Sequence, residues 1–236
     1  MSLLSLGTQV CSRIGITAPS SFSSSSDPQI TQVIAIANEE GQELAARYPW
    51  QAITIEKTFA SVATEIQGTV AALAGTDFKY ILNNIMWDRT LLRPVLGPLM
   101  PAQWQELKAR NITGPWSQYR IRGGNILFIP IPSAGDTIAF EYISKNWVTL
   151  NAGGTGSAWA NDADVALIDE QVMTQGVIWR WKAAKGMEYA EDFDKYERLV
   201  ADAMGRDGGK PTLNLEGLHG DYPYGITIAL GSWGPF

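Results

Sequence analysis

The stretch Tyr119–Pro132, which reads YRIRGGNILFIPIP, decides the fold class of this 236-residue chain. Two runs rich in β-branched and aromatic residues flank Gly123 and Gly124, and such residues favour strands. Adjacent glycines supply the positive φ angles that a tight type I′ turn requires. The sequence therefore predicts an antiparallel hairpin here, with the two glycines at its turn.

Further strands are predicted on both sides of this hairpin, from runs of the same kind. These runs are Ala52–Phe59, Tyr80–Met86, Leu91–Leu96 and Thr137–Ile143. Between them, the segment Pro101–Arg110 places Trp104 and Leu107 on one face at helical spacing, which predicts a short helix. The chain from Trp50 to Leu150 is therefore expected to form a small, mainly antiparallel β region.

Two helices are predicted before the β region. Apolar residues recur every three or four positions over Leu3–Ile14, as on one face of a helix. Asp27 and Pro28 then mark the start of a longer helix, with Asp27 as the N-cap and Pro28 in the first turn. An apolar stripe continues this helix to Arg47, and Pro49 ends it.

Two more helices are predicted after the β region. Beyond a glycine-rich loop over Asn151–Ser157, Asn161 or Asp162 is expected to cap a third helix that continues through Lys185. An apolar stripe over Tyr189–Gly205 predicts a fourth helix.

Each of these helices has a single apolar face, which another element must cover. We therefore predict an α+β fold in which the N- and C-terminal helices form a helical bundle, with a mainly antiparallel β lobe inserted between them. The predicted units are the N-terminal helices (1–49), the inserted β lobe (50–150), the C-terminal helices (151–206) and an extended C-terminal arm (207–236).

The predicted arm, Asp207–Phe236, reads DGGKPTLNLEGLHGDYPYGITIALGSWGPF. Its spread of glycines and prolines rules out a stable helix, yet it is apolar where disordered tails are usually polar. It is expected to lie extended along a surface, either as a strand of the chain's own sheet or as an arm on a neighbouring subunit or protein. We predict that it docks on a neighbouring subunit or on another protein, through Leu213, Leu215, Leu218, Tyr222, Tyr224, Ile226, Ile228, Trp233 and Phe236.

The composition disfavours a nucleic-acid-binding protein. The net charge is −6, and tight binding to a phosphate backbone needs clustered lysines and arginines. Charged residues make up only 18% of the chain and tryptophan occurs nine times. This combination indicates either a tryptophan-rich core or a surface that is covered in an assembly.

The cellular compartment is predicted from the same data. A single cysteine excludes an intrachain disulfide framework, which fits folding in the cytoplasm. The first residues lack the charged and continuous apolar regions of a signal peptide, and no run reaches the length of a transmembrane helix. We expect no membrane association.

No catalytic, cofactor-binding or metal-binding residues are predicted. The single histidine, His219, lies between glycines with no nucleophile turn nearby, and Cys11 lies near an apolar stripe. The segment Gly153–Gly156 lacks the Lys-Ser/Thr pair of a phosphate-binding loop. The densest acidic cluster lacks the glycine of a calcium loop, and its acids are expected in capping positions. That cluster is Asp162, Asp164, Asp169 and Glu170.

The tetrad Trp179-Arg180-Trp181-Lys182 is the candidate for a contact between subunits. On a helix the two tryptophans point about 200° apart, so both cannot join one apolar stripe. One is expected in the helical bundle, and the other, beside Arg180 and Lys182, either faces a neighbouring subunit or packs on the β lobe. We predict an inter-subunit contact through Arg180, Trp181 and Lys182.

The order of these motifs resembles the head-to-tail adaptor proteins of tailed bacteriophages, especially those of short-tailed phages, and the resemblance covers roughly residues 1–206. The matching segments are Tyr48–Trp50, Trp87-Asp88, Pro101–Trp104, Tyr119–Pro132, Phe140–Ser144, Asn161–Asp164, Leu167–Glu170, Gly176–Lys182, Lys185-Gly186 and Tyr189-Ala190. Each motif is weakly specific alone, and the arm has no counterpart in this series.

The resemblance implies a structural, non-enzymatic virion protein of the neck between capsid and tail, assembled in the host cytoplasm. It implies a ring of commonly twelve copies beneath the portal protein, with tail nozzle or fibre proteins as further partners. Double-stranded DNA would pass through the ring without specific binding, which an acidic channel favours.

Two alternatives remain open at the level of sequence. Nine tryptophans and a β lobe also suit a carbohydrate- or surface-binding module of a virion. A hydrolase with a carboxylate pair is a weaker alternative, because no spacing fixes two acids at a defined separation. The scattered acids are Glu56, Glu65, Asp77 and Asp88.

Overall fold

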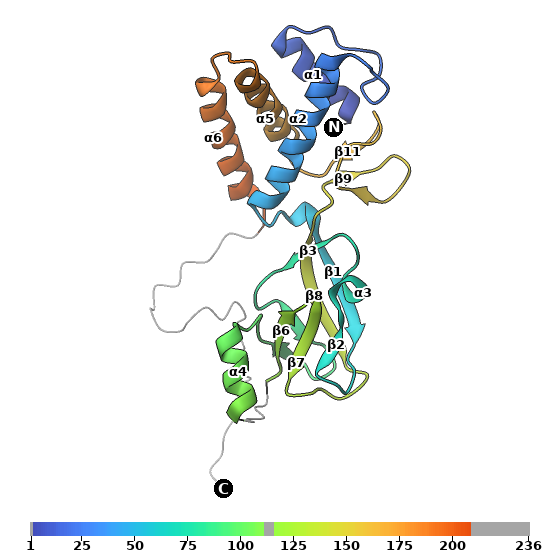
Figure 1. The fold of residues 1–236 in the computed structure, drawn as a ribbon, viewed down its shortest axis with the longest axis vertical. Helices are drawn as coiled ribbons and strands as arrows, with labels where there is room; N and C mark the ends of the chain where they lie inside the picture. Colours follow the sequence, from blue (N-terminus) through green and yellow to red (C-terminus); the bar gives the residue numbers. More distant parts are fainter. Residues whose placement is uncertain (1, 111–115, 209–236) are drawn as a thin grey trace, which may run out of the picture.

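The computed structural model describes residues 2–110 and 116–208. The molecule is elongated, with its longer helices gathered at one end and most of its strands at the other (Figure 1). It is a mixed α+β protein with antiparallel sheets, as predicted. Except for Asp207 and Gly208, the predicted arm and all of its docking residues lie outside the described residues.

The helical end is built from α1 (Leu3–Ile14), α2 (Pro28–Arg47), α5 (Glu170–Ala184) and α6 (Ala190–Arg206). The predicted cap of α2 is confirmed, because the Asp27 carboxylate accepts the N–H of Gln29 and Pro28 occupies the first turn. Helix α5 contacts the other three helices, and so it is buried over the continuous run from Val172 to Ile178. A helix surrounded in this way carries apolar residues on more than one face.

The predicted start of the third helix, at Asn161 or Asp162, is wrong. Helix α5 begins at Glu170, with Asp169 as its N-cap, and residues Val165–Ala166 form the short strand β11 instead. The cause is Asp164, whose carboxylate accepts backbone N–H groups from Asn151, Ala160 and Asn161 and so holds this segment as a loop. Strand β11 pairs with β9 (Val148–Thr149), which also pairs with β10 (Thr155–Gly156) inside the predicted loop.

The strand-rich end contains two antiparallel sheets. The first has the order β1-β8-β4-β5, with β3 also paired to β8, and the second has the order β2-β7-β6. Their strands are β1 (Thr54–Ala60), β2 (Ile66–Thr69), β3 (Phe78–Ile81), β4 (Met86–Asp88), β5 (Arg93–Val95), β6 (Gln118–Arg122), β7 (Asn125–Ile129) and β8 (Thr137–Ser144). Three short helices complete this end of the chain, namely η1 (Gln51–Ile53), α3 (Val70–Leu73) and α4 (Pro101–Arg110).

The predicted hairpin is confirmed as β6 and β7, with Gly123 and Gly124 at φ angles of 57° and 73°. The strand predicted over Tyr80–Met86 is divided into β3 and β4. The break lies at Asn84, which adopts a left-handed φ of 56° and donates its N–H to the carbonyl of Gly97.

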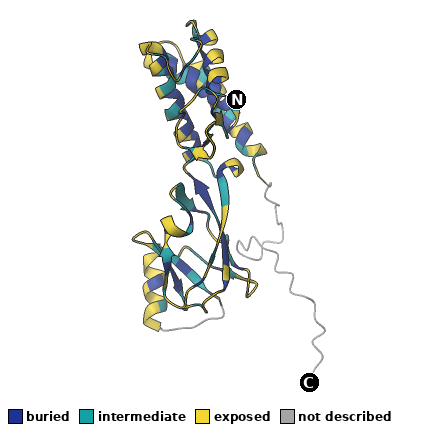
Figure 2. Cartoon of the chain, turned by 90° about the vertical axis from the view of Figure 1, so that its right-hand side faces the viewer, coloured by how far each residue is buried: buried dark blue, intermediate teal, exposed yellow. Residues whose placement is uncertain are grey.

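Two apolar cores lie in line along the molecule (Figure 2). The helical core combines α1, α2, α5 and α6 with residues that precede β1 or follow β8, among them Trp50, Ile53, Trp147 and Val148. The second core lies between the two sheets. Strand β8 joins both, since Phe140 and Tyr142 belong to the second core and Ile143 to the first. Within the described part of the chain, no helix combines the length and apolar character needed to span a membrane.

Candidate interaction sites

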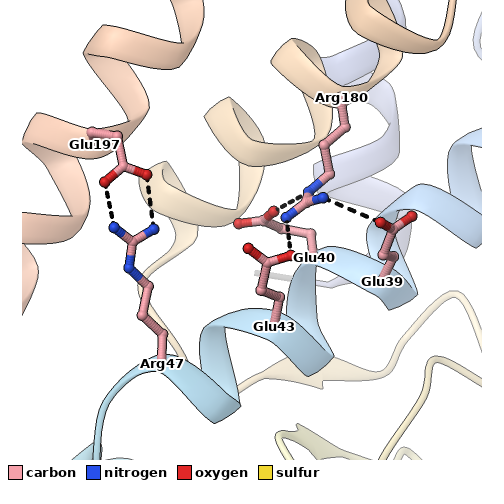
Figure 3. Close-up of polar contacts among 6 residues, drawn as sticks. All are labelled: Glu39, Glu40, Glu43, Arg47, Arg180 and Glu197. Atoms are coloured by element: carbon pink, nitrogen blue, oxygen red, sulfur yellow. Dashed lines mark hydrogen bonds and ion pairs between the residues drawn. The ribbon is translucent and has the colours of Figure 1, made fainter.

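A cluster of one arginine and three glutamates lies between α2 and α5 (Figure 3). The Arg180 guanidinium donates from Nε to Glu40 Oε2 at 2.7 Å, from Nη1 to Glu39 Oε1 at 3.2 Å and from Nη2 to Glu43 Oε2 at 2.5 Å. The Glu40 side chain is fully buried and that of Arg180 is 11% exposed, whereas Glu39 and Glu43 reach solvent. A guanidinium carries five N–H donors in one plane, so a single arginine can bind several carboxylates at once.

The surroundings of Glu40 explain why α2 and α5 approach closely at this point. A Cβ atom on Gly176 would lie 2.2 Å from the Glu40 carboxyl carbon, so only glycine leaves room for the carboxylate. Glu40 Oε1 has no hydrogen-bond partner among the described residues. Burial raises the pKa of Glu40, and the Arg180 hydrogen bond opposes that shift. Burial and the neighbouring Glu40 charge raise the pKa of Tyr196.

A second ion pair ties α2 to α6. Arg47 donates to both carboxylate oxygens of Glu197, with a distance of 2.8 Å between Nη1 and Oε1 (Figure 3). The Arg47 guanidinium also lies 5.9 Å from the centre of the Tyr196 ring. Hydrogen bonding to Arg47 lowers the pKa of Glu197. The polar contacts of α2 therefore reach both C-terminal helices.

The tetrad expected at an interface has partners within the chain. Trp181 is 2% exposed in the helical core, with Lys185 Nζ 4.5 Å from its ring centre. Lys182 pairs with Asp192, and Trp179 packs edge-on against Phe193 at 5.1 Å. The inter-subunit contact through Arg180, Trp181 and Lys182 stays a prediction, and the burial of Trp181 leaves little of its surface within reach of a neighbour.

Three acids of the cluster near residue 162 accept hydrogen bonds from backbone N–H groups. The Asp162 carboxylate accepts the N–H groups of Phe22 and Ser23, Asp164 holds the loop described above, and Asp169 caps α5. Burial acts to raise the pKa of Asp164, but its three backbone donors outweigh burial and lower it. Within residues 2–110 and 116–208, no group of three or more His, Cys, Asp and Glu side chains is placed to hold a metal ion.

The other residues considered for chemistry are Cys11, His219 and the scattered acids. Cys11 is buried in the helical core, and burial raises the pKa of its thiol, so the reactive thiolate is disfavoured. His219 lies outside the described residues. The scattered acids have separate partners: Glu56 pairs with Arg89, Glu65 with Lys108, Asp77 accepts from Tyr142 and Ser144, and Asp88 accepts from the backbone of Thr90 and Leu91.

The base of the predicted arm lies where the helical and strand-rich ends meet. Asp207 follows the last residue of α6, and its carboxylate accepts the N–H of Gln51 at 2.9 Å. Trp50, Asp169 and Arg206 help to line a hollow of about 190 Å³ beside this contact. Asp207 therefore lies at the junction of the helical and strand-rich ends, and its partner Gln51 is three residues before the start of β1.

Sequence reasoning missed the buried carboxylate, although a signal was present. Glu40 lies three residues after Ala37 and four before Leu44, which places it on the apolar stripe of α2. A glutamate on such a stripe needs a buried cation or a shifted pKa. A basic residue on another helix was therefore to be expected opposite it, and Arg180 fills that place.

A comparison with models of known protein families gives no match for this chain, and a comparison with curated proteins gives none either.

Proposed function

We propose that this protein is a structural subunit of a phage head-to-tail adaptor ring, joining a portal protein to the tail. The proposal includes a helical bundle formed by both ends of the described chain, an inserted β lobe and a C-terminal arm that docks on a partner. The observation that carries it is that α1 and α2 share one apolar core with α5 and α6, while the sheets between them in sequence have a second core. The resemblance of the motif order supports the same architecture.

The proposed partners are portal protein, tail nozzle or fibre proteins, and further copies of the chain in a ring that extends the DNA channel. A net charge of −6 suits a channel along which DNA slides without binding. Genome retention and ejection would be the outcome in the virion neck, with no catalytic step by this subunit.

The position of Asp207 supports a docking arm. Its contact with Gln51 holds the residue after α6 beside the segment that leads into β1. Residues 209–236 contain the nine predicted docking side chains and only one lysine, so apolar contacts would provide most of their affinity. A segment that orders only on its partner binds when that partner presents the site.

The test compares the full chain with a chain ending at Gly208, which keeps the Asp207 contact. A matched control replaces residues 209–236 by a glycine- and serine-rich segment of the same length. We expect all three proteins to fold, and only the full chain to add ring density to purified portal rings in negative-stain micrographs. Ring binding by the shortened chain would contradict the docking arm, and failure of the full chain to bind would contradict the adaptor function.

The fold gives little support to the alternative of a tryptophan-rich binding module. Five of the tryptophans are buried in the described part of the chain, namely Trp50, Trp104, Trp147, Trp159 and Trp181. A side chain in a core cannot stack on a sugar. A glycan array probed with the full chain checks this alternative directly.

A further inference from the structure

The outer face of the first sheet carries two acids side by side. Side chains alternate across a strand, and Phe140 and Tyr142 of β8 point into the second core. Glu141 therefore points outward, and it lies directly opposite Glu56 of β1 in the antiparallel register. Like charges at directly opposed positions, about 5 Å apart, destabilise a sheet. A feature of this cost calls for a cation.

Among the described residues, only one of the two acids pairs with a cation. Arg89 Nη2 lies 2.7 Å from Glu56 Oε1, in an exposed pair. Glu141 is half-buried and makes no ion pair or side-chain hydrogen bond with any described residue. The site therefore keeps a carboxylate that a positive group from outside the chain can reach.

A hollow of about 340 Å³ adjoins this carboxylate. Glu56, Glu141 and Arg89 line one part of it, and Trp87, Ala139 and Leu92 line the apolar part. Ala139 of β8 is paired with Trp87 of β4, and its small side chain leaves space beside the indole. A carboxylate beside an aromatic wall is the arrangement that binds a guanidinium group with its aliphatic stem.

The hollow is held in shape by its own turn. Asp88 accepts the N–H groups of Thr90 and Leu91, and Leu92 adopts a left-handed φ of 54°. Such a conformation is strained for leucine and persists only where its surroundings fix it. Even so, the Leu92 side chain is 80% exposed. The turn thus presents an apolar rim to solvent in a fixed position.

Guanidinium groups of the matching kind lie on the outer face of the second sheet. Tyr119 and Ile121 of β6 face the second core, so Arg120 and Arg122 point to the opposite side. Neither arginine pairs with a carboxylate of the described residues. They are two residues apart on one strand and therefore point to the same side of the sheet.

We propose that the hollow over β8 and β4 of one copy receives Arg122, supported by Arg120, of a second copy. The two sheets enclose one core, so their outer faces lie on opposite sides of the strand-rich end. A contact between opposite faces is heterologous and leads from copy to copy in one direction, so it closes into a ring when the rotation fits. Residues 211–236 contain no lysine or arginine, so the C-terminal segment cannot supply the guanidinium.

The contact stands on the geometry of the sheets, and only its place in a portal-bound ring rests on the proposed function. The experiment uses the full chain with Glu141→Arg or Arg122→Glu, alone and in an equal mixture, in sedimentation velocity over a concentration series. We expect self-association of the unchanged chain and a Kd at least about tenfold weaker for each variant alone. In the mixture the association should return to that of the unchanged chain, because the introduced arginine of one variant faces the introduced glutamate of the other.

Two exposed residues of α6 provide the control, since Glu191→Arg and Arg198→Glu repeat the charge changes away from both faces. These variants should associate as the unchanged chain does. An unchanged chain that stays monomeric up to about 1 mM overturns the inference, as does a mixture no stronger than its components. Portal binding is measured separately, so either result leaves the adaptor function to its own test.

Discussion

Glu40 is a fully buried acid that depends on a cation supplied by another helix. Removing one member of a buried ion pair costs far more than removing both, because an uncompensated charge stays behind. The neighbouring Glu39 and Glu43 reach solvent, and they add contacts to Arg180 without needing it in the same way. The residue that the helical core depends on most in this cluster is therefore Arg180.

We expect Arg180→Met to lower the free energy of unfolding by about 3 kcal/mol at pH 8. The loss should be smaller at pH 5. Burial already raises the pKa of Glu40 above its unfolded value of about 4.3, and removing the cation raises it further. Between the unfolded and folded pKa values the native state binds more protons, so stability falls as pH rises through that window.

Urea denaturation of the variant and of the unchanged chain at both pH values measures this difference. The double variant Arg180→Met with Glu40→Gln should be more stable than Arg180→Met at pH 8 and should show a smaller difference between the two pH values. Equal losses at pH 5 and pH 8 for the single variant would show that Glu40 does not respond to Arg180.

At the scale of elements, two glycines allow close packing around α2, one against α5 and one against Trp147. Gly176 makes room for the Glu40 carboxylate, and a Cβ atom on Gly41 would lie 2.3 Å from the Trp147 ring. Glycine inside a helix is otherwise unfavourable by roughly 0.5–1 kcal/mol relative to alanine. These helices accept that cost because the packing allows no larger side chain.

The substitution Gly176→Ala should therefore destabilise the protein by about 1–3 kcal/mol, although alanine is the better helix former. The matched control is Gly205→Ala in α6, where an added Cβ meets no atom within 4 Å. That variant should gain up to about 1 kcal/mol. Thermal unfolding followed by circular dichroism compares the two, and a gain in stability for Gly176→Ala would contradict the packing argument.

Elements with a strong local signal could be predicted from the sequence. The glycine pair of the hairpin, the Asp27 cap and the helix over Pro101–Arg110 were all determined by neighbouring residues. The start of α5 and the strands β9, β10 and β11 could not be predicted in this way. They depend on the Asp164 carboxylate accepting the N–H groups of Asn151, Ala160 and Asn161, and on two-residue strands that are too short to show a period.

The candidate sites divide along the same line. The buried pair of Glu40 and Arg180 joins residues 140 positions apart, and only the position of Glu40 on an apolar stripe hinted at it. The pair of Glu56 and Glu141 requires the register of β1 against β8, which no spacing in the sequence reveals. Tertiary pairing of this kind is specified by packing rather than by local pattern.

At the scale of the whole molecule, β8 makes one folding unit of two cores. Phe140 packs in the second core, and Ile143, three residues later, packs in the helical core. Strand β8 pairs with β1 over seven residues, from Thr137 to Ile143, so one ladder runs from the second core to the helical core. The helical end and the strand-rich end of the molecule should therefore unfold together.

We expect Phe140→Ala, which creates a cavity in the second core, to cost about 3–5 kcal/mol. Native-state hydrogen exchange should then show the protection of amides in α5 falling by a similar free energy. The control variant Val10→Ala, in the helical core, should lower protection in β8 in the same manner. Unchanged protection of α5 in the Phe140 variant would show that the two cores open independently.

The bond between Asp207 and Gln51 also decides how the molecule would carry a mechanical load. A load that reaches the described fold through Gly208 would enter it at the junction where α6 ends and η1 leads into β1. The force would act on the end of α6 and on the start of the seven-residue strand β1, and not on either tip of the elongated molecule. A tether placed there would let the strand-rich end be held in tension while the helices stay seated.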